Sequence, residues 1–418
     1  MHKIMTNVFF DPGRIDLKIP AGRYFKGLGI VYFYNKKKMR HIQLLILLFF
    51  AGLTVQAQDA AVKLYEEGLV LKKEKKMKEA VDKFRQAVAL KADYYQANYE
   101  IGWCSNDLKD YTTAMAALKK ARPFWPDMPK VHFELGYAFE KLGFKDSAKN
   151  CYNKAILLKS DYSLAHKQLG VMDYVDEDYT NALMHFAAYE AAERGKGSTI
   201  EDYLYWYRKG FSQNALKLYD EAKISLAKSI EKKSDYINAY LEMGFACNKL
   251  KQGDEAISYF QQAIDRDPKS HIPYNGIGEV YRDTKKDIDM AMTWYQKSLS
   301  VKKDERKACF GMGYCLNSKG RYSDAVPYLE KAIEQENTYT AAYVELGYSL
   351  YMTSRNEEAL DKLNKAVSLN PKNENSRYYA GLIYINQKNK TKAQQMVDEL
   401  KALGSKNAST LQEKVNKM

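Results

Sequence analysis

The chain has 418 residues, of which 46% are hydrophobic and 28% are charged, as is ordinary for a folded, water-soluble protein. One core of this length would be unusual, so the length predicts several domains or an array of repeats. Residues 1–57 carry +7 of the net charge of +13 (nine Lys and Arg against two Asp and Glu); residues 58–418 carry only +6 (56 against 50), which does not indicate a nucleic-acid partner.

An apolar run near the N-terminus has the features of an export signal. Residues 44–55 read LLILLFFAGLTV, which is too short to span a bilayer, since a spanning helix needs about 20 residues. A short basic start (residues 39–41) precedes the run, and the small residues Val55 and Ala57 follow it. This order predicts a secretory signal peptide over residues 39–57 that is cleaved after Ala57 and leaves no membrane span.

Residues 1–38 do not fit this signal, because a signal peptide normally begins at the N-terminus. We expect translation to begin at Met39, or residues 1–38 to form a disordered extension. The alternative for the apolar run is an uncleaved anchor. If the run fails to export a reporter, a cytoplasmic location follows instead.

The rest of the chain repeats with a period of 34 residues. Its most regular feature is a series of glycines, called the ladder glycines below: Gly68, Gly102, Gly136, Gly170, Gly210, Gly244, Gly278, Gly313, Gly347 and Gly381. Ala follows nearly every ladder glycine after twelve residues, and a large apolar residue comes four positions later. The pattern predicts pairs of short helices in which the glycine of the first faces the alanine of the second, so that the backbones approach closely.

This pattern resembles the tetratricopeptide repeat family over about residues 61–407, or ten units. The resemblance implies an all-α, right-handed superhelical solenoid of about ten helix-turn-helix units. An amphipathic pattern at residues 408–418 predicts a C-terminal helix that caps the open end.

The repeat array is interrupted between its fourth and fifth units. Asp173 and Gln213 replace residues that are apolar in other units, and six extra residues separate the fourth and fifth units. We expect a block of four units and a block of six, joined by a bend or a softer joint. The predicted bounds are 61–196 for the first block, 197–202 for the insertion and 203–407 for the second block.

In this family the first helix of each pair lines the concave face, and the resemblance implies that its exposed positions include the residue after each ladder glycine and the one three further on. A spacing of three places both side chains on one helix face. The predicted groove residues are Trp103, Asn106, Tyr137, Phe211, Asn214, Phe245, Asn248, Tyr314, Asn317 and Tyr348. Asn amides can pair with a peptide backbone, and aromatic rings supply contact area, so we expect a protein or peptide partner. The alternative is that the rings only pack against the adjacent first helix.

Other recurring residues favour structural roles. Glutamates recur two residues before the ladder glycine, as Glu66, Glu100, Glu134, Glu242 and Glu345. We interpret them as solvated or inter-repeat polar contacts in preference to an ion site. The basic run KKEKKMK at residues 72–78 is typical of a solvated loop. The five cysteines form no CxxC pair and fall mostly on apolar positions, so we expect buried thiols, no disulfide framework and no metal site.

Catalytic signatures are lacking in this sequence. It contains no HExxH, no Gly-rich phosphate loop and no GxSxG, so we expect no enzyme activity and no cofactor. Cochaperone members of the family clamp a carboxylate tail with Lys and Asn; here only Lys167 matches one of those positions, so the clamp is not expected.

The function that these features favour is a non-catalytic scaffold of the bacterial cell envelope, in the periplasm or outside the cell. The alternative is a structural subunit of a secretion or surface-assembly complex, which would form a homo-oligomer.

Overall fold

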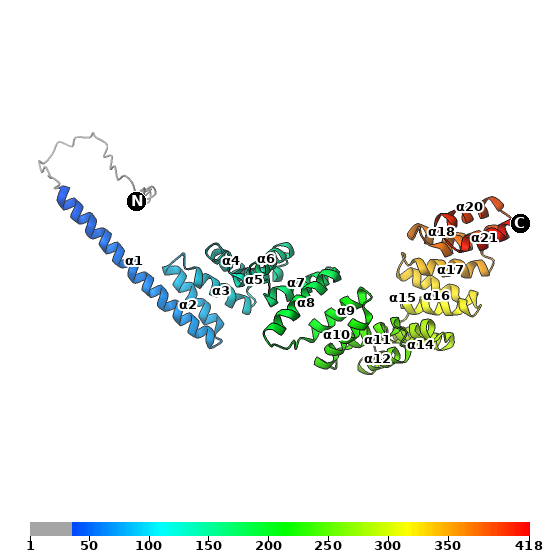
Figure 1. The fold of residues 1–418 in the computed structure, drawn as a ribbon, viewed down its shortest axis with the longest axis horizontal. Helices are drawn as coiled ribbons and strands as arrows, with labels where there is room; N and C mark the ends of the chain where they lie inside the picture. The colour runs from blue at the N-terminus through cyan, green and yellow to red at the C-terminus, as the bar shows by residue number, and fades with distance from the viewer. Residues whose placement is uncertain (1–35) are drawn as a thin grey trace, which may run out of the picture. The chain divides into compact units, whose positions relative to one another are not determined.

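The computed structural model describes residues 36–418, and the observations below refer to that part of the chain. Within it the secondary structure is helical throughout, with no strand. The chain divides into two compact units, of which the first ends at Ala97 and the second begins at Asn98, and each is described by itself. The expected all-α fold of helix pairs with a C-terminal capping helix is confirmed (Figure 1).

The helices alternate as first and second members of a pair. The first unit contains α1 (Lys36–Lys73), α2 (Met77–Leu90) and the start of α3 (Tyr95–Asp107). The later pairs are α3 with α4 (Tyr111–Ala121), α5 (Pro129–Lys141) with α6 (Lys145–Leu158), α7 (Ser163–Val175) with α8 (Tyr179–Gly195), α9 (Tyr203–Ala215) with α10 (Tyr219–Lys232), α11 (Ile237–Lys249) with α12 (Gly253–Arg266), α13 (Ile272–Glu279) with α14 (Ile288–Val301), α15 (Arg306–Ser318) with α16 (Tyr322–Gln335), α17 (Thr340–Met352) with α18 (Asn356–Leu369), and α19 (Glu374–Asn386) with α20 (Lys390–Ala402). The 3₁₀ turn η1 (Arg122–Phe124) follows α4, the π-helical turn η2 (Val280–Lys285) follows α13, and α21 (Asn407–Asn416) ends the chain.

In the first unit, α1 is continuous from the predicted signal segment into the first repeat. Its buried residues begin at Ala61, and Gly68 lies against the ring of Phe84 on α2. Leu44, Leu45 and Ile46, which lie in the predicted signal, are exposed. Of the helices in residues 36–418, none combines the length and the apolar character that a bilayer crossing requires. The prediction about residues 1–38 concerns mostly residues 1–35, which lie outside the described part.

Each first helix ends in the same way. One residue after the helix adopts a left-handed backbone, which satisfies the last carbonyls and turns the chain into the second helix. After α5 this residue is Gly143, with φ +84°. The N–H of the next residue, Phe144, donates to the carbonyl of Phe139 at 2.9 Å. Most other turns place a lysine there, as at Lys217 and Lys251, which is a less favourable residue for this conformation.

The ladder glycines provide space for a large side chain. A methyl group added at Gly136 would lie 2.9 Å from the ring of Tyr152, and one added at Gly102 would lie 2.4 Å from Leu118. The predicted close approach of the backbones is present, since such a methyl group at Gly170 would lie 3.3 Å from the carbonyl oxygen of Ala182. However, the nearest neighbour of eight of the ten ladder glycines is the large residue sixteen positions later and not the alanine. That residue folds back over the first helix, where only a hydrogen atom fits beneath it.

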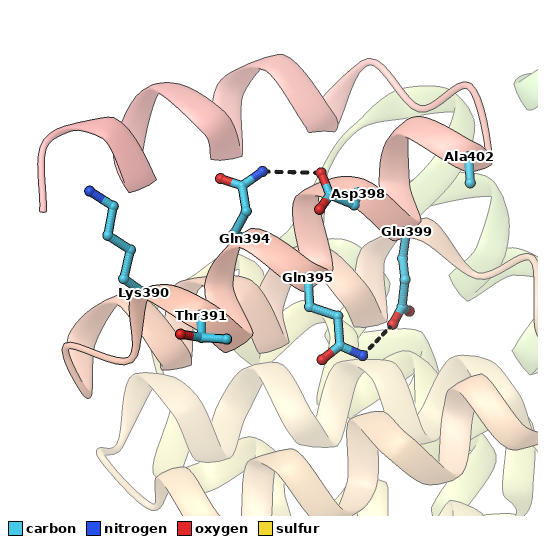
Figure 2. Close-up of a pocket in the computed structure, with 7 residues that line it drawn as sticks. All are labelled: Lys390, Thr391, Gln394, Gln395, Asp398, Glu399 and Ala402. Atoms are coloured by element: carbon cyan, nitrogen blue, oxygen red, sulfur yellow. Dashed lines mark hydrogen bonds between the residues drawn. The ribbon is translucent and has the colours of Figure 1, made fainter.

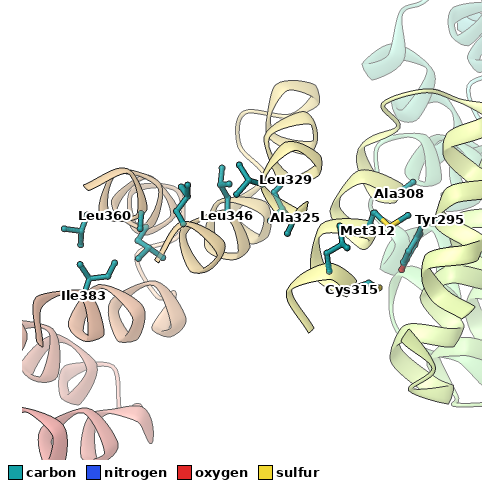
Figure 3. Packing of buried hydrophobic residues seen from close by; sticks show 14 of the residues in the cluster. Tyr295, Ala308, Met312, Cys315, Ala325, Leu329, Leu346, Leu360 and Ile383 are labelled. Carbon is teal, nitrogen blue, oxygen red and sulfur yellow. The ribbon is translucent and has the colours of Figure 1, made fainter. Parts of the chain in front are cut away.

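The buried core runs from one repeat to the next. Figure 3 shows part of it, where residues of α14 to α19 form one continuous cluster that includes Tyr295, Met312, Leu329, Leu346 and Ile383. All five cysteines are free and buried, as predicted. Burial raises the pKa of Cys247 to about 12 and the pKa of Cys309 and Cys315 to about 11, which keeps these thiols protonated at neutral pH.

The polar residues at the predicted joint are each satisfied. Asp173 is buried and accepts a hydrogen bond from Lys149 at 2.9 Å, and Gln213 accepts one from the hydroxyl of Ser225 at 2.7 Å. The predicted insertion, residues 197–202, is held by the indole N–H of Trp206, which donates to the carbonyl of Ile200 at 2.9 Å. The division into blocks at 61–196 and 203–407 stays a prediction.

Candidate protein-binding face

The predicted groove aromatics share one surface position in the second unit, called the first-helix face below. This face consists of the residues that follow the ladder glycines and carry a ring: Trp103, Tyr137, Phe211, Phe245, Tyr314 and Tyr348. Each ring is partly exposed, and Tyr314 is the most exposed, at 37%. Each therefore has surface available to a partner.

Four of these rings also pack against the preceding repeat. A tyrosine at the start of its second helix makes each contact, with centroid distances of 5.6 to 6.2 Å: Tyr111 with Tyr137, Tyr179 with Phe211, Tyr219 with Phe245, and Tyr322 with Tyr348. Such pairs favour tilted or edge-on geometry and stabilise the contact by about 0.5–1.5 kcal/mol. These four rings therefore pack within the chain and are also partly exposed. Their contact with a ligand stays a prediction.

The asparagines of the predicted groove form bonds between repeats. The Nδ2 group of Asn106 donates to the carboxylate of Glu134 at 2.8 Å and to its backbone carbonyl at 3.0 Å. The same pair of bonds joins two further sets of residues, at 2.9 and 3.1 Å in each: Asn214 with Glu242, and Asn317 with Glu345. We call each of these three pairs an Asn–Glu clasp.

The clasps give the asparagines a structural role that the sequence interpretation missed. Asn106, Asn214 and Asn317 are buried, and both N–H groups of each amide are engaged within the chain. The N–H groups of these amides are therefore not available to a partner's peptide backbone. Conversely, the expectation that the recurring glutamates make inter-repeat polar contacts is confirmed for Glu134, Glu242 and Glu345. The available signal was the constant spacing of 28 residues between asparagine and glutamate.

The seventh repeat, which contains α13 and α14, departs from both patterns. Gly276 stands at the position that the clasp glutamates occupy in three other repeats, and Glu279 stands where those three repeats have the ring. The oxygen of Asn248 instead accepts a hydrogen bond from the hydroxyl of Thr284 at 2.8 Å. Thr284 lies in η2, where a one-residue insertion is accommodated as a π-helical turn, a feature that is frequent at functional sites.

A pocket of about 310 Å³ opens at this irregular repeat. Its walls come from α11, α12, α13, the loop before α13 and the region where α15 begins: Leu241, Glu242, Phe245, Phe260, His271, Ile272, Asn275, Gly276, Glu279, Glu305 and Lys307. Phe245 is one of the predicted groove residues, so this pocket adjoins the first-helix face.

A second pocket lies on the outer face of α20. All seven lining residues belong to this one helix, and Figure 2 shows that they run along it, with Gln394 donating to Asp398 and Gln395 donating to Glu399 at 3.1 Å. The polar groups therefore satisfy one another along an open surface.

Two buried histidines lie between α7 and α8. The Nε2 atom of His166 is 2.9 Å from the carbonyl of Ser160, which can only accept, so this nitrogen carries the proton. The Nδ1 atom of His166 then accepts from Nδ1 of His185 at 3.1 Å, which leaves Nε2 of His185 unprotonated, 3.7 Å from Asp173. Burial lowers the pKa of His185. In residues 36–418, no group of His, Cys, Asp and Glu side chains is arranged to hold a metal ion.

Comparison with known proteins supports the repeat assignment. Tetratricopeptide repeat models match residues 65–129, 129–162, 237–270 and 273–305. A model described as anaphase-promoting complex, cyclosome, subunit 3 matches residues 318–400.

Curated relatives are distant and longer. The Superkiller complex protein 3 of Mus musculus is 24% identical over 325 residues, which cover 73% of this chain and 18% of that protein. The protein O-mannosyl-transferase Tmtc3 of Drosophila melanogaster is 24% identical over 367 residues, which cover 83% of this chain and 39% of that protein. The chain thus spans well under half of the length of these relatives.

Solved structures align with this chain at low identity. The Cut9–Hcn1 hetero-tetramer of the APC/C aligns with a TM-score of 0.47 at 14% identity and covers 88% of this chain and 98% of that chain. YrrB, described as a TPR protein with an unusual peptide-binding site, aligns with a TM-score of 0.40 at 22% identity, over 46% of this chain and 98% of that chain. The 34-residue period, the paired helices and the matching repeat models together identify tetratricopeptide repeats in this chain at residues 65–162 and 237–305.

Proposed function

We propose that the chain is a non-catalytic scaffold that binds a segment of another protein along its first-helix face. The observation that carries this proposal is the set of six partly exposed rings on that face, four of which are held by a tyrosine of the preceding repeat. Rings held in this way supply contact area at low entropy cost, which is the property of residues that dominate binding energy. The protonated, buried thiols support the non-catalytic assignment.

Site-specific crosslinking tests this proposal. A photoreactive phenylalanine is introduced at Phe245 or Tyr137 on the first-helix face, and at Ile224 or Leu157, which are exposed on second helices, as matched controls. Under illumination in cells, the first-helix positions should capture one defined partner that the controls do not. Equal capture from both sets of positions would contradict the assignment of the binding face.

We also propose that the chain is exported to the cell envelope of a bacterium. The order of basic, apolar and small residues over 39–57 supports this, and so does the exposure of Leu44, Leu45 and Ile46, which do not pack into the repeats. Mass spectrometry of the mature protein should find Gln58 as its first residue. A mature chain that retains residues 39–57, together with failure of this segment to export a fused phosphatase, would refute export.

A further inference from the structure

We infer that the pocket at the seventh repeat receives a cationic side chain of the partner segment, with arginine as its best occupant. This inference rests on the proposed binding along the first-helix face and deepens it, because it names the chemistry of one anchor residue. It is carried by the pocket itself, by the carboxylates around it and by a buried amide oxygen that has no hydrogen-bond partner.

Two repeat patterns fail at this pocket. A methyl group added at Gly276 would lie 2.5 Å from the ring of Phe260, so the ring excludes the side chain that a clasp glutamate would need. Gly276 and Phe260 both line the pocket, which therefore has no glutamate at this position. The volume of about 310 Å³ lies at the lower end of the range for small-ligand pockets, which suits one long side chain better than a folded element.

The walls are rich in hydrogen-bond acceptors. Glu242, Glu279 and Glu305 supply carboxylates, against one cationic side chain, that of the exposed Lys307. Asn275 is 3% exposed, and its Nδ2 donates to Glu305 at 2.7 Å, while its Oδ1 atom has no partner. An isolated buried acceptor costs about 1–3 kcal/mol, so a donor brought by a ligand would be favoured here.

The shape of this surface favours arginine over simpler cations. A guanidinium group presents five N–H donors in a plane and stacks on aromatic rings, and Phe245 offers a ring at the edge of the pocket. Leu241 and Ile272 offer apolar surface for the aliphatic part of the side chain.

Saturation-transfer NMR with the full chain tests this inference. The probe is the capped peptide acetyl-Ala-Ala-Arg-Ala-Ala-amide, compared with a matched peptide in which citrulline replaces arginine and removes only the charge. The arginine methylene groups should receive saturation from the protein, with an affinity at least tenfold above that of the citrulline peptide. The lysine peptide should bind with intermediate affinity.

Variants of the protein locate the effect. Glu279→Gln should weaken arginine-peptide binding at least tenfold, Lys307→Gln should strengthen it about two- to threefold, and Glu413→Gln, on the exposed face of α21, should leave it unchanged. Circular dichroism checks that each variant is folded, and the citrulline comparison uses the unmodified protein. Equal binding of the arginine and citrulline peptides, or equal binding by Glu279→Gln and the parent, would overturn the inference. If crosslinking from position 245 still captures a defined partner in that case, the proposed function stands and only the cationic anchor fails.

Discussion

The Asn–Glu clasps allow a sharp test of what holds neighbouring repeats together. In the clasp between α15 and α17, Asn317 donates to the carboxylate of Glu345 at 2.9 Å and to its carbonyl at 3.1 Å. Asn317→Leu keeps the side-chain volume and removes both bonds. It also removes the bond that the hydroxyl of Ser349 donates to Oδ1 of Asn317 at 2.6 Å, but this hydroxyl keeps a second acceptor, the carbonyl of Glu345, at 2.9 Å. A bond to a charged group contributes about 1.5–3 kcal/mol and a neutral one about 0.5–1.5 kcal/mol. We therefore expect the free energy of unfolding to fall by about 2–4 kcal/mol at pH 7.5.

The pH dependence gives this prediction a second signature. Burial raises the pKa of Glu345, and the bond from Asn317 opposes that rise. Without the bond, the folded-state pKa rises further above its value in the unfolded chain. The added penalty is absent below the unfolded pKa of about 4.5, where Glu345 is protonated in both states, and it grows as the pH rises through the folded-state pKa. The stability loss of Asn317→Leu should therefore be smaller at pH 4.5 than at pH 7.5.

Urea unfolding measures the loss, and hydrogen exchange in α15 and α17 shows whether it is local, which matters in an array whose repeats can open separately. The double variant Asn317→Leu with Glu345→Leu should recover at least about 1 kcal/mol relative to the sum of the single variants, because no buried carboxylate then lacks a donor. A loss under about 0.5 kcal/mol for the single variant, or strict additivity in the double variant, would refute the clasp as a stabilising contact.

Three further predictions follow from the packing and the charges. Gly136→Val should lower the free energy of unfolding by about 1–3 kcal/mol, because the new side chain would meet the ring of Tyr152. Gly195→Ala should not lower it, because the added methyl group meets no atom within 4 Å. Urea titrations compare the two variants. The folded-state pKa of His185 is lowered, so this side chain binds more protons in the unfolded chain than in the folded one. The free energy of unfolding should therefore decline as the pH falls below about 6.5. His185→Asn should flatten this decline, as measured by thermal melts between pH 7.5 and 5.5. Trp103→Ala and Phe245→Ala should reduce partner capture more than they lower the melting temperature; the reverse order, measured by pull-down and calorimetry, would assign these rings to packing alone.

The fold was accessible from the sequence because its main constraint is local and periodic. Each ladder glycine marks a point where a large side chain leaves no room for a Cβ atom, and that constraint returns with every repeat, as at Gly102 and Gly136. The capping helix was readable for the same reason, since Leu411 and Val415 fall on one apolar face and are buried.

The partners of the polar residues were harder to predict. Asn106 and Glu134 meet only because two separate first helices lie side by side, and spacing within one helix does not indicate that contact. The glycine's neighbour was misjudged for a related reason, because the position of a long side chain depends on how it folds back between helices. The pocket at the seventh repeat required three departures at once, at Gly276, at Glu279 and in the inserted turn.

The last repeat carries a consequence for self-assembly. Gly381 meets Leu411 of α21 and not the residue sixteen positions later, and α21 packs against both α19 and α20. The position that a further repeat would use is therefore already taken by the chain's own final helix. A second copy could use this position only after displacing Leu411 and Val415, which are both fully buried.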